Sequence, residues 1–212
     1  MGQVSIQVYV DESKPNGFVL AGAQIPCGAA SKLRDVVNGL LLPKQVRLHF
    51  TSEREKRRRQ IISALVEAGS IGTVIYDASS FGNDHKGARS AAIAAMAARV
   101  ARIPVARIVL EADESTVNHD RKLILAILKV AGVEDSVGCD HLACKDEPLL
   151  AIPDAVAWCL HQGRRVAQAR RTTHNGHRTL VIKWHTSAKP GPPTVRKATG
   201  LDFARLPPRA HL

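Results

Sequence analysis

The sequence is poor in aromatic residues and cysteines, and it has no long apolar segment. Phe, Trp and Tyr make up 4% of its 212 residues, which argues against recognition of single strands by base stacking. The four cysteines are too few and too irregularly spaced for a disulfide scaffold, so we expect reduced thiols and a cytoplasmic protein. No run of about eighteen apolar residues occurs, so neither a membrane-spanning helix nor a membrane partner is expected.

Acidic residues are almost missing from the last quarter of the chain. Residues 164–212 contain eleven Lys or Arg residues and a single acid, Asp202. Nearly all of the net charge of +11 therefore lies in this segment. Such an asymmetry predicts a basic extension that binds a polyanion, with nucleic acid as the first candidate, although a solvated tail would have the same composition.

The remaining residues, 1–163, have the length and pattern of one α/β domain. Alternating and β-branched runs predict strands at 3–10, 18–25, 46–50, 71–76, 106–112 and 137–143. Helical patterns are expected at 31–42, from 51 or 52 onward, and at 88–103, 121–130 and 153–162. This order predicts a mixed sheet with an antiparallel N-terminal hairpin at one edge and flanking helices. In the extension, 179–185 could form one more strand, and 187–212 is expected to be extended or disordered.

Carboxylates follow three predicted elements that are far apart in the chain. Asp11 ends the first strand, and Glu111 and Asp113 end a middle strand, where their spacing of two would place them on one face. Asp154 lies in the first turn of the last helix, where the helix dipole alone would favour it. Acids that converge are unfavourable unless a cation offsets their charge, and hard oxygen ligands suit Mg²⁺ or Mn²⁺. The pattern predicts a metal site formed by Asp11, Glu111, Asp113 and Asp154.

Other chemistry-bearing residues have competing interpretations. His49 follows a predicted strand and could contact substrate or assist proton transfer, but it could equally be structural. The basic run at 53–59 could bind phosphates, although a solvated helix face with Glu–Lys pairs is the preferred interpretation. Cys139, His141 and Cys144, with Cys159 or His161 as a fourth ligand, form an alternative zinc site.

Several short motifs in this order resemble a known family. They are a YVDES strand end, a second strand FVLAG, LHF before a basic helix, VLEADES on a middle strand, and a terminal helix that begins near LLAIPDAVA. Together they resemble the RNase H-like proteins grouped as domain of unknown function 3800, over roughly residues 4–162. The resemblance implies an RNase H-like fold in which Asp11, Asp113 and Asp154 would bind two divalent ions and hydrolyse a phosphodiester. This chain has Pro153 where that family commonly has Ala.

We therefore expect a nuclease dependent on Mg²⁺ or Mn²⁺ that acts on RNA or DNA by a two-metal mechanism. Two other functions remain open at this point. One is a nucleic-acid-binding protein that has the fold but no turnover. The other is an interaction module of a mobile element or defence system, which would form a homodimer or bind a protein partner.

Overall fold

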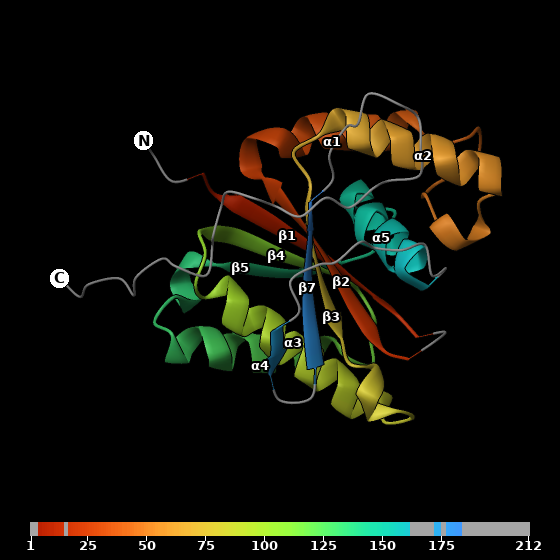
Figure 1. Cartoon of the computed structure of the whole chain (residues 1–212). Helices are drawn as coiled ribbons and strands as arrows, with labels where there is room; N and C mark the ends of the chain where they lie inside the picture. Colours follow the sequence, from red (N-terminus) through yellow and green to blue (C-terminus); the bar gives the residue numbers. More distant parts are fainter. Residues whose placement is uncertain (1–3, 15–16, 162–171, 175–176, 184–212) are drawn as a thin grey trace.

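A single mixed sheet with helices on both faces forms the fold (Figure 1). The computed structural model describes residues 4–14, 17–161, 172–174 and 177–183. The strands are β1 (Ile6–Ser13), β2 (Val19–Pro26), β3 (Gly72–Asp77), β4 (Val105–Glu111), β5 (Gly138–Leu142), β6 (Thr172–His174) and β7 (His177–Lys183). The helices are α1 (Ala30–Gly39), α2 (Glu55–Ala68), α3 (His85–Val100), α4 (Val117–Val130) and α5 (Ala151–His161).

The sheet has the strand order β5-β4-β1-β2-β3-β7-β6. β2 runs antiparallel to both β1 and β3, whereas β1, β4 and β5 are parallel neighbours. The antiparallel N-terminal hairpin is confirmed, but its expected place at an edge is wrong. β1 lies inside the sheet because apolar side chains are buried on both of its faces, Val8 and Val10 on one and Tyr9 on the other.

Two helical layers cover the two faces of the sheet (Figure 1). α3 and α4 pack on the face that Val8 and Val10 point to, and the apolar stripe of α3 fits this role. That stripe consists of Ala88, Ala92, Ile93 and Met96. α1, α2 and α5 cover the opposite face, where Tyr9 is fully buried. Residues next to each other on β1 therefore face different layers.

The strand expected at 46–50 is wrong. This segment is part of a loop that connects α1 to a short 3₁₀ helix, Phe50–Ser52, before α2. Its Val46 side chain is 74% exposed, and the Phe50 N–H donates a hydrogen bond to the Asp154 carboxylate instead of to a strand. The β-branched Val46 favours a strand locally, but among the described residues this segment does not pair with a strand.

The predicted extra strand near 179–185 corresponds to β7, which pairs antiparallel with β3 and forms a hairpin with β6. This part of the basic extension therefore continues the sheet of the domain. The expectation of an extended or disordered segment at 187–212 lies outside the described residues. Within the part of the chain that the structure describes, no helix is long and apolar enough to cross a membrane.

Candidate functional site

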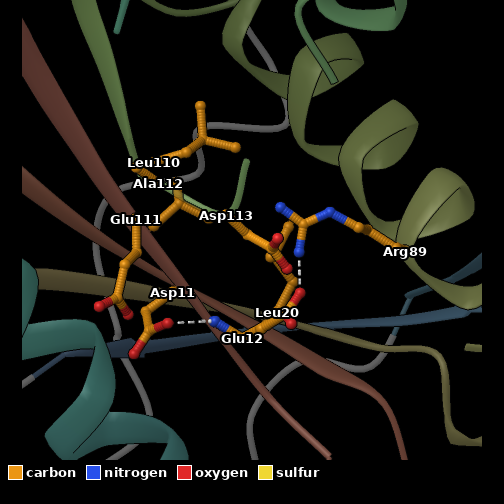
Figure 2. A pocket seen from close by; sticks show the side chains of 9 residues that line it. Asp11, Glu12, Leu20, Arg89, Leu110, Glu111, Ala112 and Asp113 are labelled. Atoms are coloured by element: carbon orange, nitrogen blue, oxygen red, sulfur yellow. Dashed lines mark hydrogen bonds and ion pairs between the residues drawn. The ribbon is translucent and has the colours of Figure 1, made fainter. Parts of the chain in front are cut away.

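Asp11 and Glu111 lie side by side at one end of the sheet. The parallel register of β1 and β4 brings the two strand ends into line. Side chains alternate along a strand, and Tyr9 and Val109 belong to the core beneath α1, α2 and α5, so both acids face that layer. Figure 2 shows their carboxylates close together on the side of α5. The fold thus brings together two acids that are separated by about a hundred residues in the sequence.

Asp154 joins this pair from α5, which packs across β1 and β2. It lies in the first turn of that helix although Pro153 precedes it. One of its carboxylate oxygens, Oδ2, accepts a hydrogen bond from the Phe50 N–H at 2.9 Å. The same oxygen lies 3.1 Å from Nδ1 of His49, whose side chain is 45% exposed. The predicted residues Asp154 and His49 are therefore in direct contact.

The surroundings of Asp11 disfavour its negative charge. Burial raises the pKa of the Asp11 carboxyl well above its usual range, and Glu111 and then Asp154 raise it further. Arg47 acts in the opposite direction on the same pKa. A cation among these acids would relieve the repulsion and restore the charged form of Asp11.

Protein groups already engage the oxygens of these acids. Oε1 of Glu111 accepts hydrogen bonds from Arg47 Nη1 at 3.2 Å and Cys144 Sγ at 3.0 Å, while Oδ1 of Asp11 accepts one from the Glu12 N–H at 2.7 Å. Among the described residues, no three His, Cys, Asp or Glu side chains are arranged, as they stand, to hold a metal ion. The oxygen donors suit Mg²⁺ or Mn²⁺ chemically. Cation binding would therefore require these side chains to change their arrangement.

Asp113 lies in a turn and not on β4, which ends at Glu111. Its Oδ1 accepts hydrogen bonds from the Ser115 hydroxyl at 2.7 Å and the Ser115 N–H at 3.0 Å. These two bonds lower the pKa of Asp113. The expectation that Glu111 and Asp113 share one face of an extended strand is therefore wrong. Asp113 is exposed. It lines a cavity of about 220 Å³ together with Asp11 and Glu111 and also with Glu12 and Arg89 (Figure 2).

The opposite side of the strand ends holds a second group of charges, which are paired. Arg89 of α3 forms an ion pair with Glu12 and donates through Nη2 to Asp120 of α4 at 2.6 Å (Figure 2 shows the contact with Glu12). Asp120 is fully buried, and Nε2 of His141 on β5 lies 3.8 Å from its Oδ2. Burial by itself raises the pKa of Asp120, but His141 and Arg89 outweigh it and lower the pKa.

Sequence reasoning missed Arg89 and Asp120, although a signal was present. Arg89 lies on the apolar stripe of α3, three and four residues before Ala92 and Ile93. Asp120 precedes the buried Ile124 of α4 by four residues. A charged residue on an apolar stripe indicates a buried ion pair, because it would otherwise be desolvated without a partner.

The residues of the alternative zinc site are not brought together. Cys139 packs against the core beneath α3 and α4, whereas Cys144 is buried on the other face with Glu111, so the sheet separates the two thiols. Cys159 packs on the same face as Cys144. The prediction of zinc at these residues is wrong for this reason, and the side chain of His161 lies outside the described residues.

The basic run of α2 is largely structural. Arg58 donates to the carbonyl oxygens of Phe50 and Thr51 at 3.0 and 2.7 Å and lies 4.3 Å from the centroid of the Trp158 ring. The solvated face that was expected applies to Arg59, which pairs with a glutamate one turn away. Arg58 thereby fixes the loop whose residues reach Asp154.

Comparisons with known proteins identify the fold. No protein-family model matches the chain, and no curated protein sequence matches it. Among solved structures, the chain is similar to RNase HII in the structure of the PCNA:RNase HII complex from Archaeoglobus fulgidus. The TM-score is 0.50 at 15% identity, and the match covers 74% of this chain and 72% of that chain. This protein has an RNase H-like fold. The predicted fold class is confirmed, and at this identity the likeness concerns the fold alone.

Proposed function

We propose that this protein is a nuclease that depends on Mg²⁺ or Mn²⁺ and hydrolyses phosphodiester bonds of RNA or DNA. The observation that carries the proposal is the convergence of Asp11, Glu111 and Asp154 from β1, β4 and α5 at one end of the sheet, and the raised pKa of Asp11 there agrees with a place where a cation would be stabilising. The RNase H-like fold and the resemblance to the family of domain of unknown function 3800 support the same chemistry.

Asp11, Glu111 and Asp154 would hold the cations, because their side chains face one layer of the fold. When bound, such cations would activate a water molecule and stabilise the leaving oxygen of the substrate. Asp113 keeps its charge through the two hydrogen bonds from Ser115 and adds to the negative charge of the cavity. It would assist cation binding from the rim of the site.

His49 would exchange a proton with the substrate or with water. The contact of its Nδ1 with Asp154 orients the ring, and 45% of the side chain is exposed to the solvent from which a substrate would approach. Phe50, next to it, is held by the hydrogen bond from its N–H to Asp154 and by the hydrogen bond from Arg58 to its carbonyl oxygen. An imidazole fixed in this way can transfer a proton through Nε2.

The nucleic acid would also contact the basic segment 164–212, most of which lies outside the described residues. Contacts of Lys and Arg with phosphates raise affinity without selecting sequence and weaken as salt increases. A binding protein without turnover would keep this affinity and would tolerate the loss of Asp11. An interaction module would bind a protein and show no preference for polyanions.

The proposal is tested by cleavage of labelled single-stranded and double-stranded RNA, DNA and RNA–DNA hybrid. The variants are Asp11→Asn, Asp154→Asn and Asp113→Asn, each assayed with Mg²⁺, Mn²⁺ or EDTA. Asp135→Asn is the matched control, since Asp135 is exposed just before β5, at the other end of the sheet. We expect cleavage only with a divalent cation, a loss of at least about a hundredfold in Asp11→Asn and Asp154→Asn, and a smaller loss in Asp113→Asn.

Three other results would contradict the proposal in different ways. Binding without cleavage by the wild type would favour the inert binding protein. Cleavage that survives in EDTA would exclude the metal-dependent mechanism. A failure to bind any of the substrates would favour the interaction module.

A further inference from the structure

A loop of residues 40–54 connects α1 to α2 and passes beside the carboxylates. It is tethered along its length. The Leu42 N–H donates to the Gln45 side chain, which in turn donates to the buried Glu53 at 2.7 Å. Phe50 at its far end is fully buried and packs edge-on against Trp158 with ring centroids 5.3 Å apart. The path of the loop backbone between these anchors is therefore restrained by the fold.

Arg47 is the residue of this loop that brings a positive charge to the site. Its Nη1 donates to Oε1 of Glu111 at 3.2 Å, and it opposes the rise in the pKa of Asp11. Its side chain is 43% exposed, and that of Glu111 is 30% exposed. An ion pair with this exposure contributes little to stability, on the order of 0–1 kcal/mol.

Other arginines in the same layers are bound far more firmly. Arg34 donates two of its nitrogens to the buried Glu147 and one to the Tyr9 hydroxyl. Arg58 has two carbonyl acceptors and the Trp158 ring. Among the described residues, Glu111 is the side chain that Arg47 bonds to, through one nitrogen of a group with five N–H donors.

We propose that Arg47 binds a phosphate of the substrate next to the carboxylates, and that it exchanges between this phosphate and Glu111. The inference rests on the proposed nuclease function. The Arg47 guanidinium can form two parallel hydrogen bonds to phosphate oxygens. Its present contact with Glu111 uses one nitrogen and one oxygen, so this capacity is unused. Arg47 and a divalent cation compete for Oε1 of Glu111, so cation binding there would release the guanidinium toward the nucleic acid.

Binding of nucleic acid tests the phosphate contact without any catalytic step. The full chain is titrated into a fluorescein-labelled RNA or DNA duplex in EDTA over a range of salt concentrations, followed by anisotropy. The variants are Arg47→Ala and Arg47→Lys, and Arg59→Ala is the control because Arg59 is exposed and pairs with Glu55 on α2. We expect Arg47→Ala to weaken binding about tenfold and to reduce the slope of log Kd against log salt by about one. Arg47→Lys should restore the slope but only part of the affinity, since lysine lacks the planar fork.

Binding of Mn²⁺, followed by electron paramagnetic resonance, tests the exchange. Removal of the competing charge in Arg47→Ala should tighten Mn²⁺ binding several-fold relative to wild type and to Arg59→Ala. Weaker Mn²⁺ binding in Arg47→Ala, or an unchanged affinity and salt slope for nucleic acid, would overturn the inference and leave the nuclease proposal standing. A wild type that binds neither duplex overturns both, so the two failures are distinguishable.

Discussion

Asp11 and Glu12 are adjacent on β1, yet they lie in opposite electrostatic environments. On the side of α5, Asp11 meets Glu111 and Asp154, and its pKa is raised. On the side of α3, Glu12 meets Arg89, which also neutralises Asp120 and helps to lower the pKa of that buried acid. A carboxylate is therefore unfavourable as an anion on one face and is stabilised on the other.

This difference separates two uses of buried charge. A buried carboxylate that is matched by a guanidinium with several hydrogen bonds joins β1, α3 and α4 and serves the fold. A group of carboxylates with one weakly held arginine is unfavourable for the fold and suits a cation from solution. The comparison is consistent with a structural role for the charges on the α3 side and supports the proposal that cations bind on the α5 side.

The largest effect on stability is expected from removing Arg89, which pairs with Glu12 and Asp120. Arg89→Met would leave the buried Asp120 without its guanidinium and the partly buried Glu12 with the exposed Lys14 as partner, and should lower the free energy of unfolding by about 3–5 kcal/mol. Urea denaturation followed by circular dichroism measures this loss. The combined variant Glu12→Gln, Arg89→Met and Asp120→Leu should recover most of it, because no unpaired charge remains. A loss below about 1 kcal/mol in Arg89→Met would show that the network is not structural.

A divalent cation should stabilise the protein by binding to Asp11, Glu111 and Asp154. Mn²⁺ at about a hundred times its dissociation constant should raise the free energy of unfolding by about 2.7 kcal/mol. The gain should be lost in Asp11→Asn and kept in Asp135→Asn, as measured by urea denaturation with and without EDTA. An equal gain in both variants would place the bound ion elsewhere.

In the absence of a cation, substitution of Asp11 should change the free energy of unfolding in the opposite direction to substitution of Asp120. Asp11→Asn removes a charge that burial, Glu111 and Asp154 disfavour, so it should stabilise the protein by about 1 kcal/mol in EDTA, although it should lose cleavage when Mg²⁺ or Mn²⁺ is present. Asp120→Asn should destabilise it under the same conditions. If both variants are destabilised in EDTA, the carboxylates near Asp11 do not repel one another as described.

The contributions of Asp11 and Asp120 to the free energy of unfolding should also change with pH in opposite directions. The pKa of Asp11 is raised in the folded state, so its contribution to stability is present below the ordinary Asp pKa of about 4 and is lost as pH rises through the folded-state pKa. The pKa of Asp120 is lowered, so its contribution is present above about 4 and is lost as pH falls through its folded-state pKa. Urea denaturation in EDTA from about pH 3 to about pH 8, compared among wild type, Asp11→Asn and Asp120→Asn, separates the two. If the free energy of unfolding changed with pH in the same way in all three proteins, the opposite pKa shifts of Asp11 and Asp120 would be contradicted.

The smallest effect tests which cation neutralises Glu12. Lys14 also pairs with this acid, at 2.6 Å, but half of its side chain is exposed. Lys14→Ala should therefore change the free energy of unfolding by less than about 0.5 kcal/mol. A larger loss, measured by urea denaturation beside Arg89→Met, would mean that Lys14 shares the structural role of Arg89.

Local patterns in the sequence predicted most of the fold. The alternation in β1 and the apolar stripes of α2 and α3 are local features, and the structure has these elements close to the expected residues. The position of the hairpin inside the sheet was not predictable, because it depends on β4 and β7 pairing from far along the chain. The strand predicted at 46–50 was wrong because the conformation of this segment depends on contacts with α5 and not on its own residues alone.

The candidate site was predictable in its acids but not in their partners. Asp11, Glu111 and Asp154 could be selected because each lies near the end of a predicted strand or in the first turn of a predicted helix. The turn at Asp113 was not expected, because the predicted strand extended to residue 112, although Ser115 offers the hydroxyl that donates to Asp113 in this turn. Arg47 gave no local signal, because a single arginine in a loop becomes meaningful only when the fold places it beside Glu111.

The position of Asp154 on α5 has a consequence for when the site forms. The complete site needs both the pairing of β1 with β4 across about a hundred residues and the docking of α5 over β1 and β2, which brings the third carboxylate. A partly synthesised or partly folded chain that lacks this docking has separate acids and no common site. If the protein is a nuclease, its activity would be delayed until folding is complete, and an immature chain would be harmless to the RNA that encodes it.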